Sequence, residues 1–413
     1  MDGTYNFSSF ATRVSNTVLC GQGQGSTIIK ATGNINVLVG NADNWTVRDL
    51  SIVGDSGQGF GVYCSRNRKN IIVERVNTSN LNIGIAIHSC ENVNINHCES
   101  FDNTLEGIYC SMETGYNWGE NISIRWNNVH DNGRKNIAVE DSDHVLIEGN
   151  ICARSAAGDY ALETTAGLMT DVKVINNSSE NATGQGIYII SCTNPRVSNN
   201  TVIGATGHGI GATTGIITNN EIRDCINWAI IYGLQIKDNA IYDCGRGIQT
   251  TETYAEISGN HIEGSTQSSS TAGAMWFSGT DQKWHDNTLV GNYNTTHWTM
   301  SGTRIYFYNN TVISSTYETL RLRSFFDDAD FIHWGNVVIG KPSSNSGISL
   351  GTGVQQTVAH GLWYTPTWDK ISIVSDNASE SASVYMSAAP DATNIYVTCN
   401  ATNSRWHWGT IGK

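Results

Sequence analysis

A short segment recurs along most of this chain, and it limits the fold more than any other feature. Its form is apolar-x-x-Asn-x-apolar, as in IEGNIC, VSNNTV, ITNNEI and ISGNHI. The asparagine stands in register at Asn127, Asn150, Asn177, Asn200, Asn220, Asn239, Asn260, Asn287, Asn310 and Asn336, and Leu50, Val76 and Cys98 keep the frame before it. The mean spacing is about 24 residues, which indicates a solenoid whose loops vary in length.

Each repeat contains three short strand-like stretches: one before the asparagine, one after it, and a third of the form Gly-apolar-x-apolar, such as GIYI. The apolar residues alternate with period two, which is typical of strands and excludes an α-helical solenoid. A leucine-rich repeat has one strand in each unit and leucines at fixed sites, so it does not fit either. The sequence therefore predicts an all-β fold, a three-sheet parallel β-helix of about 13 coils over residues 1–350.

The chain contains 44 asparagines, more than its 42 glycines, and the predicted fold explains the surplus. A residue at a sharp corner between strands often needs left-handed or bridge dihedral angles, which asparagine tolerates. Its amide can also bond to the same residue in the turns above and below. We therefore expect the recurring asparagines to form a ladder along one corner of the solenoid.

The repeat stops near residue 350, and residues 351–413 carry about five strand-like stretches separated by turn residues. This pattern predicts a small antiparallel β-sandwich that serves in sugar binding or oligomerisation. Its tryptophans either stack on sugar rings or fill a core or interface; they are Trp363, Trp368, Trp406 and Trp408.

Composition narrows the classes of partner and compartment. The net charge of −13 opposes a surface that tracks phosphates, so nucleic acid is not an expected partner. No 18-residue apolar run and no signal peptide are visible, so no membrane span is expected.

The ten cysteines form no C-x-x-C pair, and only Cys225 and Cys244 have the spacing to pair with each other. So many unpaired thiols favour assembly in a reducing cytosol, as for a virion protein, over secretion.

The third stretch of each repeat supplies the candidate active site. Alternation turns one residue outward on each of six successive turns; these are Tyr63, His88, Tyr109, Glu140, Glu163 and Tyr188, and we predict that they form a single column. Glu140 and Glu163 then lie on adjacent turns about 5 Å apart, so one carboxyl holds its proton beside an ionised partner. That separation suits a retaining glycosidase, and about 6.5–9.5 Å would suit an inverting one. A Ca²⁺ site and a plain solvated surface stay open as alternatives for this pair.

Two long loops are expected to flank Glu140. One, SMETGYNWGE, brings Glu113, Tyr116 and Trp118, and the other is ETTAGLMT. Loops that deepen a groove lined by aromatic residues suit a sugar chain. We predict substrate contacts from His88, Tyr109, Glu113, Tyr116, Trp118 and Tyr188, with Asp141, Asp159 and His208 as weaker candidates. No cofactor and no metal site are predicted, apart from Ca²⁺ as the open alternative.

Several segments resemble known families. The opening GTYNF and VLCGQGQGSTIIKA resembles the start of right-handed β-helices of the pectate-lyase superfamily, and the Asn-rich coils resemble those of carbohydrate-active β-helix proteins and phage tailspikes. GHGIGA around His208 resembles a polygalacturonase motif, and GDYALE resembles the paired-aspartate strand of those enzymes with only Asp159 retained, although their NTD and RIK motifs are absent. The C-terminal AHGL, IYVTC and WHW segments are similar to a module that follows β-helices in viral sequences.

The resemblance implies a right-handed helix, a polysaccharide partner, a homotrimer and a place on a virion surface or outside the cell. Because the chain begins inside the opening motif, we expect a further portion upstream. We interpret the protein as a tailspike-like depolymerase that cleaves a cell-surface or extracellular polysaccharide by acid/base glycoside hydrolysis, with Glu140 and Glu163 as the acid and its partner. The alternatives are a non-catalytic glycan-binding adhesin or structural spike, and a polysaccharide lyase with Arg66, Arg134 or Lys135 as its base.

Overall fold

The computed structural model describes eight segments of the chain up to residue 313, and beyond residue 330 the backbones of individual strands. The eight segments are residues 3–7, 11–12, 14–33, 35–55, 59–163, 168–265, 274–291 and 304–313, with the backbone alone for residues 7, 11–12, 161–163 and 277. The chain divides into two compact units, Met1–Cys244 and Gly245–Lys413.

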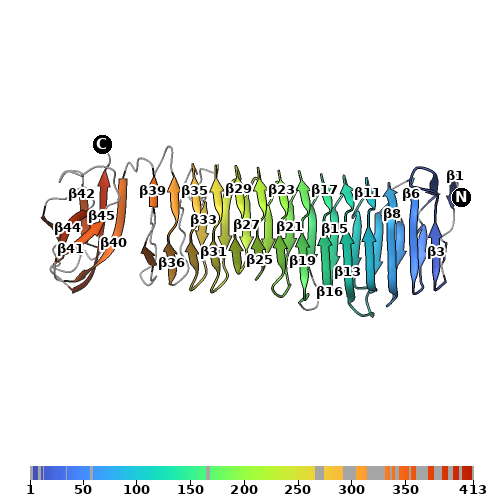
Figure 1. Cartoon of the computed structure of the whole chain (residues 1–413), viewed down its shortest axis with the longest axis horizontal. Helices are drawn as coiled ribbons and strands as arrows, with labels where there is room; N and C mark the ends of the chain where they lie inside the picture. The colour runs from blue at the N-terminus through green and yellow to red at the C-terminus, as the bar shows by residue number, and fades with distance from the viewer. Residues whose placement is uncertain are drawn as a thin grey trace. The chain divides into compact units, whose positions relative to one another are not determined.

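The first unit is a solenoid in which each full turn adds one strand to each of three parallel stacks, as Figure 1 shows for the strands coloured blue to green. The first stack contains β3 (Thr17–Cys20), the start of β6 (Trp45–Val53), the start of β8 (Lys69–Ser79), β10 (Glu91–Asn96), β13 (Gly119–Arg125), β16 (Ser142–Glu148), β19 (Val172–Ile175), β22 (Arg196–Ser198), β25 (Ile216–Thr218) and β28 (Gln235–Lys237). The second stack contains β1 (Gly3–Phe7), β4 (Thr27–Ala31), the ends of β6 and β8, β11 (Glu99–Phe101), β14 (Asn128–His130), β17 (Ile151–Ala153), β20 (Ser178–Glu180), β23 (Thr201–Ile203), β26 (Glu221–Arg223) and β29 (Ala240–Tyr242). The third stack contains β2 (Ala11–Thr12), β5 (Leu38–Gly40), β7 (Phe60–Cys64), β9 (Ile83–His88), β12 (Ile108–Ser111), β15 (Lys135–Glu140), β18 (Gly158–Glu163), β21 (Gln185–Ile189), β24 (Ile210–Ala212) and β27 (Trp228–Tyr232).

The core of the first unit consists of the inward side chains of all three stacks. In the third stack the predicted inward residues are at most 1% exposed; they are Val62, Cys64, Ile85, Ile87, Ile108, Cys110, Ile137, Val139, Tyr160, Ile187 and Ile189. The alternation seen in the sequence is therefore confirmed, and with it the all-β parallel solenoid.

The recurring asparagines form the expected ladder between the first and second stacks. From Asn127 to Asn239, each amide nitrogen Nδ2 donates to the Oδ1 of the next asparagine at 2.9–3.1 Å. The backbone N–H of each donor asparagine bonds to the same Oδ1. Because these residues are at most 3% exposed, the ladder satisfies backbone groups that would otherwise be buried without partners.

The left-handed angle, one of the two conformations expected at the corner, belongs to the residue before the ladder asparagine. Positive φ angles occur at Trp126, Gly149, Asn176, Asn199, Asn219 and Asp238, and none is recorded for the ladder asparagines themselves. The corner therefore needs two residues with different tasks. The residue before the asparagine changes the direction of the backbone at the surface. The asparagine itself forms hydrogen bonds to the next coil in the interior.

The second unit repeats this architecture in the part of it that is described. It contains β30 (Arg246–Thr250), β31 (Glu256–Ser258), β32 (His261–Glu263), β33 (Met275–Phe277), β34 (Lys283–His285), β35 (Thr288–Val290), β36 (Ile305–Tyr308), β37 (Thr311–Ile313), β38 (Phe331–Trp334) and β39 (Val337–Ile339). A ladder joins Asn260, Asn287 and Asn310. Asn336 lies outside the described residues.

Toward the C-terminus the strand pairing becomes antiparallel. One three-stranded sheet contains β40 (Ser344–Thr352), β45 (Thr402–Ile411) and β42 (Ile371–Ser375), and the other contains β41 (Gln355–Ala359), β44 (Asn394–Cys399) and β43 (Val384–Ala388). The boundary near residue 350 and the sandwich stay predictions. Trp363 and Trp368 lie outside the described residues, and Trp406 and Trp408 are described only by their backbone in β45.

The described cysteines are all free thiols. The expected pair, Cys225 and Cys244, share a hydrogen bond between their side chains. A second pair that the spacing did not indicate also lies close, since the Sγ of Cys90 is 3.7 Å from that of Cys64. Within the described segments, no helix is long and apolar enough to cross a membrane.

Candidate active site on the third stack

The outward residues of the third stack form two columns, so the prediction of a single column is wrong. Tyr63 pairs with Ala86, which pairs with Tyr109, and the line continues through Ala138 and Ala161 to Tyr188. The second column lies two residues further along the strands. There His88 pairs with Ser111, and Glu140 pairs with Glu163. Both columns face the same side, because residues two apart on a strand point the same way.

The predicted catalytic pair is in register. Glu140 and Glu163 are the last residues of β15 and β18, and they stand directly opposite each other in adjacent parallel strands. Their Cα atoms are therefore about 4.8 Å apart, the spacing of neighbouring strands. The Glu140 side chain is 18% exposed. The side chain of Glu163 and the following loop, residues 164–167, lie outside the described residues.

Tyr109 and Lys135 hold the Glu140 carboxylate. The Tyr109 hydroxyl donates to Oε2 at 2.6 Å, and the Lys135 Nζ lies 3.9 Å from Oε1. Tyr109 has Ala138 as its direct neighbour in the next turn, and this small residue leaves the phenol room to reach the next outward position. Burial and the hydrogen bond to Glu140 raise the pKa of Tyr109 well above its usual range.

An ion pair between a buried glutamate and a half-exposed arginine lies beside this group. Glu106 is only 2% exposed, and its Oε1 is 3.0 Å from the Arg134 Nη1. Burial raises the pKa of Glu106, while the positive charges of Arg134 and Lys135 oppose the shift. The sequence analysis missed Glu106 and left Arg134 and Lys135 without a position. Only the folded chain shows that Arg134 pairs with Glu106 and that Lys135 approaches Glu140.

His88 extends the site toward the N-terminus as part of an aromatic row. Its ring centroid lies 5.6 Å from that of Tyr63 and 5.4 Å from that of Tyr109, and its Nδ1 is 2.6 Å from the Ser111 Oγ. No described atom bonds to the buried Nε2. Burial lowers the pKa of His88 to about 4, so the ring is neutral at physiological pH. The predicted contact residues His88 and Tyr109 are therefore neighbours.

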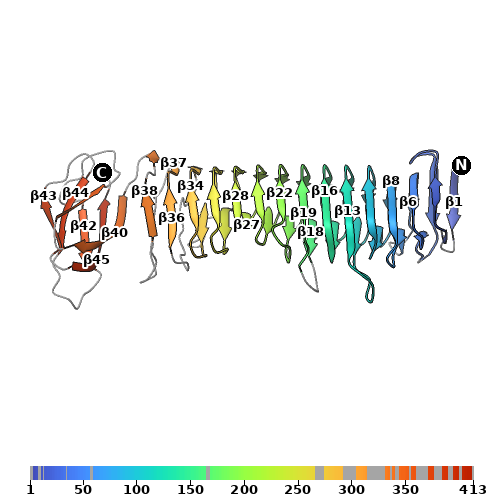
Figure 2. The ribbon, with the colours of Figure 1, turned by 60° about the horizontal axis from the view of Figure 1, so that its bottom comes forward.

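The loop that carries Glu113, Tyr116 and Trp118 bends toward earlier turns, so the expectation that it flanks Glu140 is wrong. Figure 2 shows it as the teal excursion at the lower edge of the stack. The backbone N–H of Glu113 donates to the Ser89 Oγ at 2.8 Å, and that of Asn117 donates to the Asn67 Oδ1 at 3.1 Å. These contacts anchor the loop one and two turns before its own, beside His88. Tyr116 is exposed and Trp118 half-buried.

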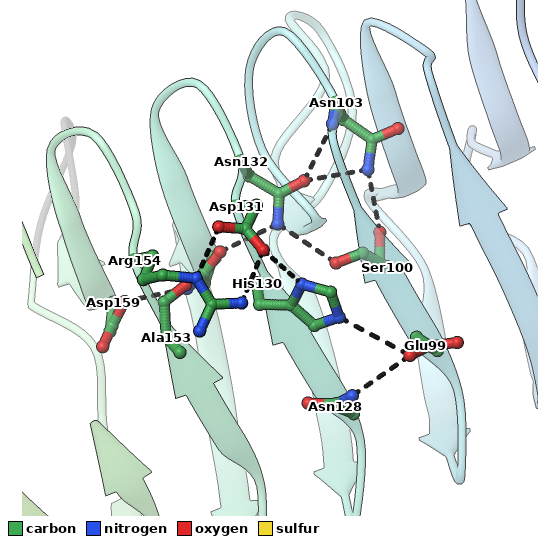
Figure 3. A network of polar contacts seen from close by, with 11 residues as sticks. Glu99, Ser100, Asn103, Asn128, His130, Asp131, Asn132, Ala153, Arg154 and Asp159 are labelled. Atoms are coloured by element: carbon green, nitrogen blue, oxygen red, sulfur yellow. Dashed lines mark hydrogen bonds and ion pairs between the residues drawn. The ribbon is translucent and has the colours of Figure 1, made fainter. Parts of the chain in front are cut away.

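Asp159 lies inside the solenoid, which removes it from the substrate-facing candidates. It is fully buried, and its two carboxylate oxygens accept bonds from Asn136 at 2.8 Å and from Ser179 at 2.6 Å. Figure 3 shows Asp159 in a chain of polar side chains that leads through Asn132 to Asn103. Burial raises the pKa of Asp159 to about 6. The polygalacturonase-like aspartate is thus a core residue.

The remaining weaker candidates lie at different distances from Glu140 along the solenoid. Asp141 follows Glu140 directly, is 5% exposed and turns the chain with a φ of 46°. Tyr188 belongs to the first column, one turn beyond Ala161. His208 precedes β24, three turns beyond β15. The structure therefore brings Asp141 next to Glu140 and does not bring His208 there.

No metal centre is present among the residues described, since no three His, Cys, Asp or Glu side chains gather as ligands there. The Glu163 side chain is not among them. What the described groups offer is an ordered carboxylate with a hydroxyl and an ammonium beside it. Such a group can accept a proton or attack an electrophilic carbon.

A family model for the right-handed β-helix region matches residues 16–166 and 116–312 of this chain. The chain belongs to this family. The match fixes the handedness that the resemblance implied, and it agrees with the parallel stacks described above.

Solved structures with a related fold include the A-module of the Azotobacter vinelandii mannuronan C-5 epimerase AlgE6, with 15% identity, a TM-score of 0.36, and coverage of 82% of this chain and 89% of that one. The PL6 family alginate lyase AlyGC has 16% identity, a TM-score of 0.49, and coverage of 81% and 50%. The receptor-binding protein of bacteriophage Det7 has 10% identity, a TM-score of 0.49, and coverage of 86% and 76%. No curated protein matches in sequence. At these identities the likeness concerns the fold alone, so function has to be argued from the site.

Proposed function

We propose that this protein is a carbohydrate-active β-helix that cleaves a polysaccharide by glycoside hydrolysis with retention at the anomeric carbon. The register of Glu140 with Glu163 carries the proposal. Two glutamates whose Cα atoms lie one strand spacing apart can bring their carboxyl groups to the separation of about 5–5.5 Å at which a retaining glycosidase works.

The contacts of Glu140 favour it as the nucleophile. It accepts a hydrogen bond from Tyr109 and faces the Lys135 ammonium, and both are contacts of a charged carboxylate. A Glu140 oxygen attacks the anomeric carbon and forms a glycosyl ester, while Glu163 gives its proton to the departing glycosidic oxygen. Glu163 then takes a proton from water, whose oxygen attacks the anomeric carbon, and the bond from that carbon to the Glu140 oxygen breaks to release the carboxylate.

The aromatic row supports a polymer as the substrate. Tyr63, His88 and Tyr109 lie on three successive turns that lead to Glu140. They cover about 10 Å along the solenoid at one strand spacing per turn, which is longer than one sugar ring needs. Aromatic faces stack on the apolar faces of sugars, so the row would hold a chain across the scissile bond.

The test is cleavage of a polysaccharide panel by the parent and by Glu140→Gln, Glu163→Gln and the double variant, with new reducing ends as the readout. We expect each single variant to lose about 100-fold or more in rate, and the double variant to lose little beyond that. Glu180→Gln, at the exposed last residue of β20, is the matched control and should cleave like the parent. If both single variants cleave as fast as the parent, the site assignment is wrong.

Lys135 favours a second candidate, β-elimination from an acidic polysaccharide. A lysine beside a tyrosine can remove the proton next to a carboxylate, as a lyase requires. Lyase products contain an unsaturated sugar that absorbs ultraviolet light, whereas hydrolase products do not. Loss of activity on chelation would support the Ca²⁺ alternative. A glycan-binding spike would retain the polymer and release no new ends.

We also propose that the chain acts as a homotrimer on a virion surface or outside the cell. The support is the resemblance of its coils to tailspikes together with its many free thiols, which suit assembly in a reducing cytosol. Sedimentation of the purified protein should give three times the mass of one chain. A monomer would contradict the trimer and would leave the proposed active site unaffected.

A further inference from the structure

One corner residue departs from the pattern of the turns that follow it, although His97 and Arg75 hold the same position with positive φ in the two turns before. Trp126 occupies the surface position before a ladder asparagine, where later turns have Gly149, Asn176 and Asn199. Its φ is 53°, in the left-handed region that asparagine and glycine adopt easily and a bulky aromatic residue rarely adopts. Its side chain is still 50% exposed. A strained backbone under an aromatic ring that stays half exposed points to a function at the surface.

The indole is held in place from several sides. The His97 ring stacks on it at 5.4 Å between centroids and 19° between planes, and the Arg125 guanidinium carbon lies 5.6 Å from its centroid. A Cβ atom at Gly149 would lie 2.5 Å from the indole Cδ1, so the absence of a side chain there gives the ring its place. Trp126 is therefore an exposed aromatic surface that loses little freedom when a ligand binds.

The rim of this surface is polar and balanced in charge. Arg125 and Glu148 are register partners on β13 and β16, and their charged groups lie 4.0 Å apart. A ligand with one apolar face and a hydroxyl-rich edge fits both the indole face and its polar rim. C–H groups meet the electron-rich indole face, and hydroxyls bond to the guanidinium and the carboxylate. The balanced charge favours a neutral ring over an acidic one.

We propose that Trp126, with Arg125 and Glu148, forms a second carbohydrate-binding site that stacks a neutral pyranose ring and lies apart from the Glu140 face. Trp126 lies between β13 and β14, at the corner of the first and second stacks, whereas Glu140 belongs to the third. A second contact of this kind would keep the protein on a polymer between cleavage events and raise its apparent affinity. The site shares its ligand class with the proposed function but does not depend on cleavage.

The experiment uses the full chain with Glu140→Gln as its background, so that cleavage cannot alter the ligand. Binding is measured on a glycan array and then by retardation in gels that contain the polymer bound best. Adding Trp126→Asn should weaken binding about tenfold or more. Asparagine suits the left-handed corner, so this variant should melt at the same temperature as its background or higher. Tyr254→Asn removes another exposed aromatic residue with a φ of 61° and should leave binding unchanged.

A footprinting measurement tests the location directly. Bound glycan should protect Trp126 from hydroxyl-radical oxidation, and Gly149→Asn, whose side chain displaces the indole, should abolish the protection. The proposal is overturned if no neutral glycan binds, if Trp126→Asn binds as well as its background, or if that variant loses stability and so reveals a packing role. Failure of the hydrolase proposal would appear separately, as cleavage that survives in Glu140→Gln.

Discussion

The buried asparagine corner and the outward face of the third stack are built from the same repeat, yet they follow opposite rules. At the corner, Asn127, Asn150 and Asn177 make the same bonds in successive turns. On the outward face, Tyr109 gives way to Ala138 in the next turn. Every turn needs the same corner to satisfy its buried backbone, whereas no turn needs a particular outward residue to fold. Repetition therefore marks the architecture, and departure from repetition marks the candidate site.

The largest effect should come from breaking the ladder. Asn177→Ala leaves the backbone N–H of Asn150 without its acceptor, removes one of the two acceptors of the Asn150 Nδ2, and takes a donor from the carbonyl of Ile147. Buried polar groups without partners cost about 1–3 kcal/mol each, so we expect a loss of about 4 kcal/mol in urea unfolding. Asn176→Ala, at the exposed neighbouring position, should cost only about 1 kcal/mol, the strain of a left-handed alanine. Equal losses in the two variants would contradict the division of tasks at the corner.

His88 should make the outward face sensitive to acid. Its pKa is about 4 in the folded protein against 6.5 for an ordinary histidine, so the unfolded chain binds a proton that the folded chain excludes between these values. Stability therefore falls as the pH drops from 6.5 to 4, by about 3 kcal/mol from this residue. In His88→Gln this part of the pH dependence should be absent, as measured by the free energy of unfolding in denaturant titrations between pH 6.5 and 4. The idea fails if parent and variant show the same pH dependence.

Asp159 should act in the opposite direction from inside the core. Its pKa is about 6 when folded against 3.8 for an ordinary aspartate, so the folded chain keeps a proton that the unfolded chain has released between these values. Stability from this residue is present below pH 3.8 and is lost as the pH rises to 6, by about 3 kcal/mol. In Asp159→Asn the Ser179 hydroxyl can turn to accept from the new amide. The free energy of unfolding of the variant should rise relative to that of the parent from pH 4 to 7. A difference between the two proteins that does not change with pH would contradict the raised pKa of Asp159.

The smallest effect separates two tyrosines of one column. Tyr109→Phe removes the hydroxyl that bonds to Glu140 and should lower kcat/KM about 10- to 100-fold with little change in the melting temperature. Tyr63→Phe, two turns earlier, keeps its ring contact with His88 and should change kcat/KM about twofold at most. Equal losses would show that the column as a whole, and not the bond to Glu140, determines the rate.

Much of the candidate site followed from the sequence, because alternation and register are local properties. They place Glu140 opposite Glu163 and turn Tyr109 outward. The loop of Glu113 was assigned to the wrong side, since its direction depends on bonds to Ser89 and Asn67, one and two turns earlier. Asp159 was misplaced for a related reason: it stands at the start of β18, where alternation does not yet decide which side faces the core.

The sequence by itself determined the parallel solenoid, its inward residues and the asparagine ladder. A repeated buried backbone makes the same demand in every turn and is met by the same residue. Only the tertiary structure decided which unlike residues meet. Tyr109 reaches past Ala138 to Glu140 in a diagonal contact between turns, and Lys135 approaches the same carboxylate from the other end of β15. A diagonal contact depends on side-chain length and on the space that its neighbours leave, and neither appears in a repeat pattern.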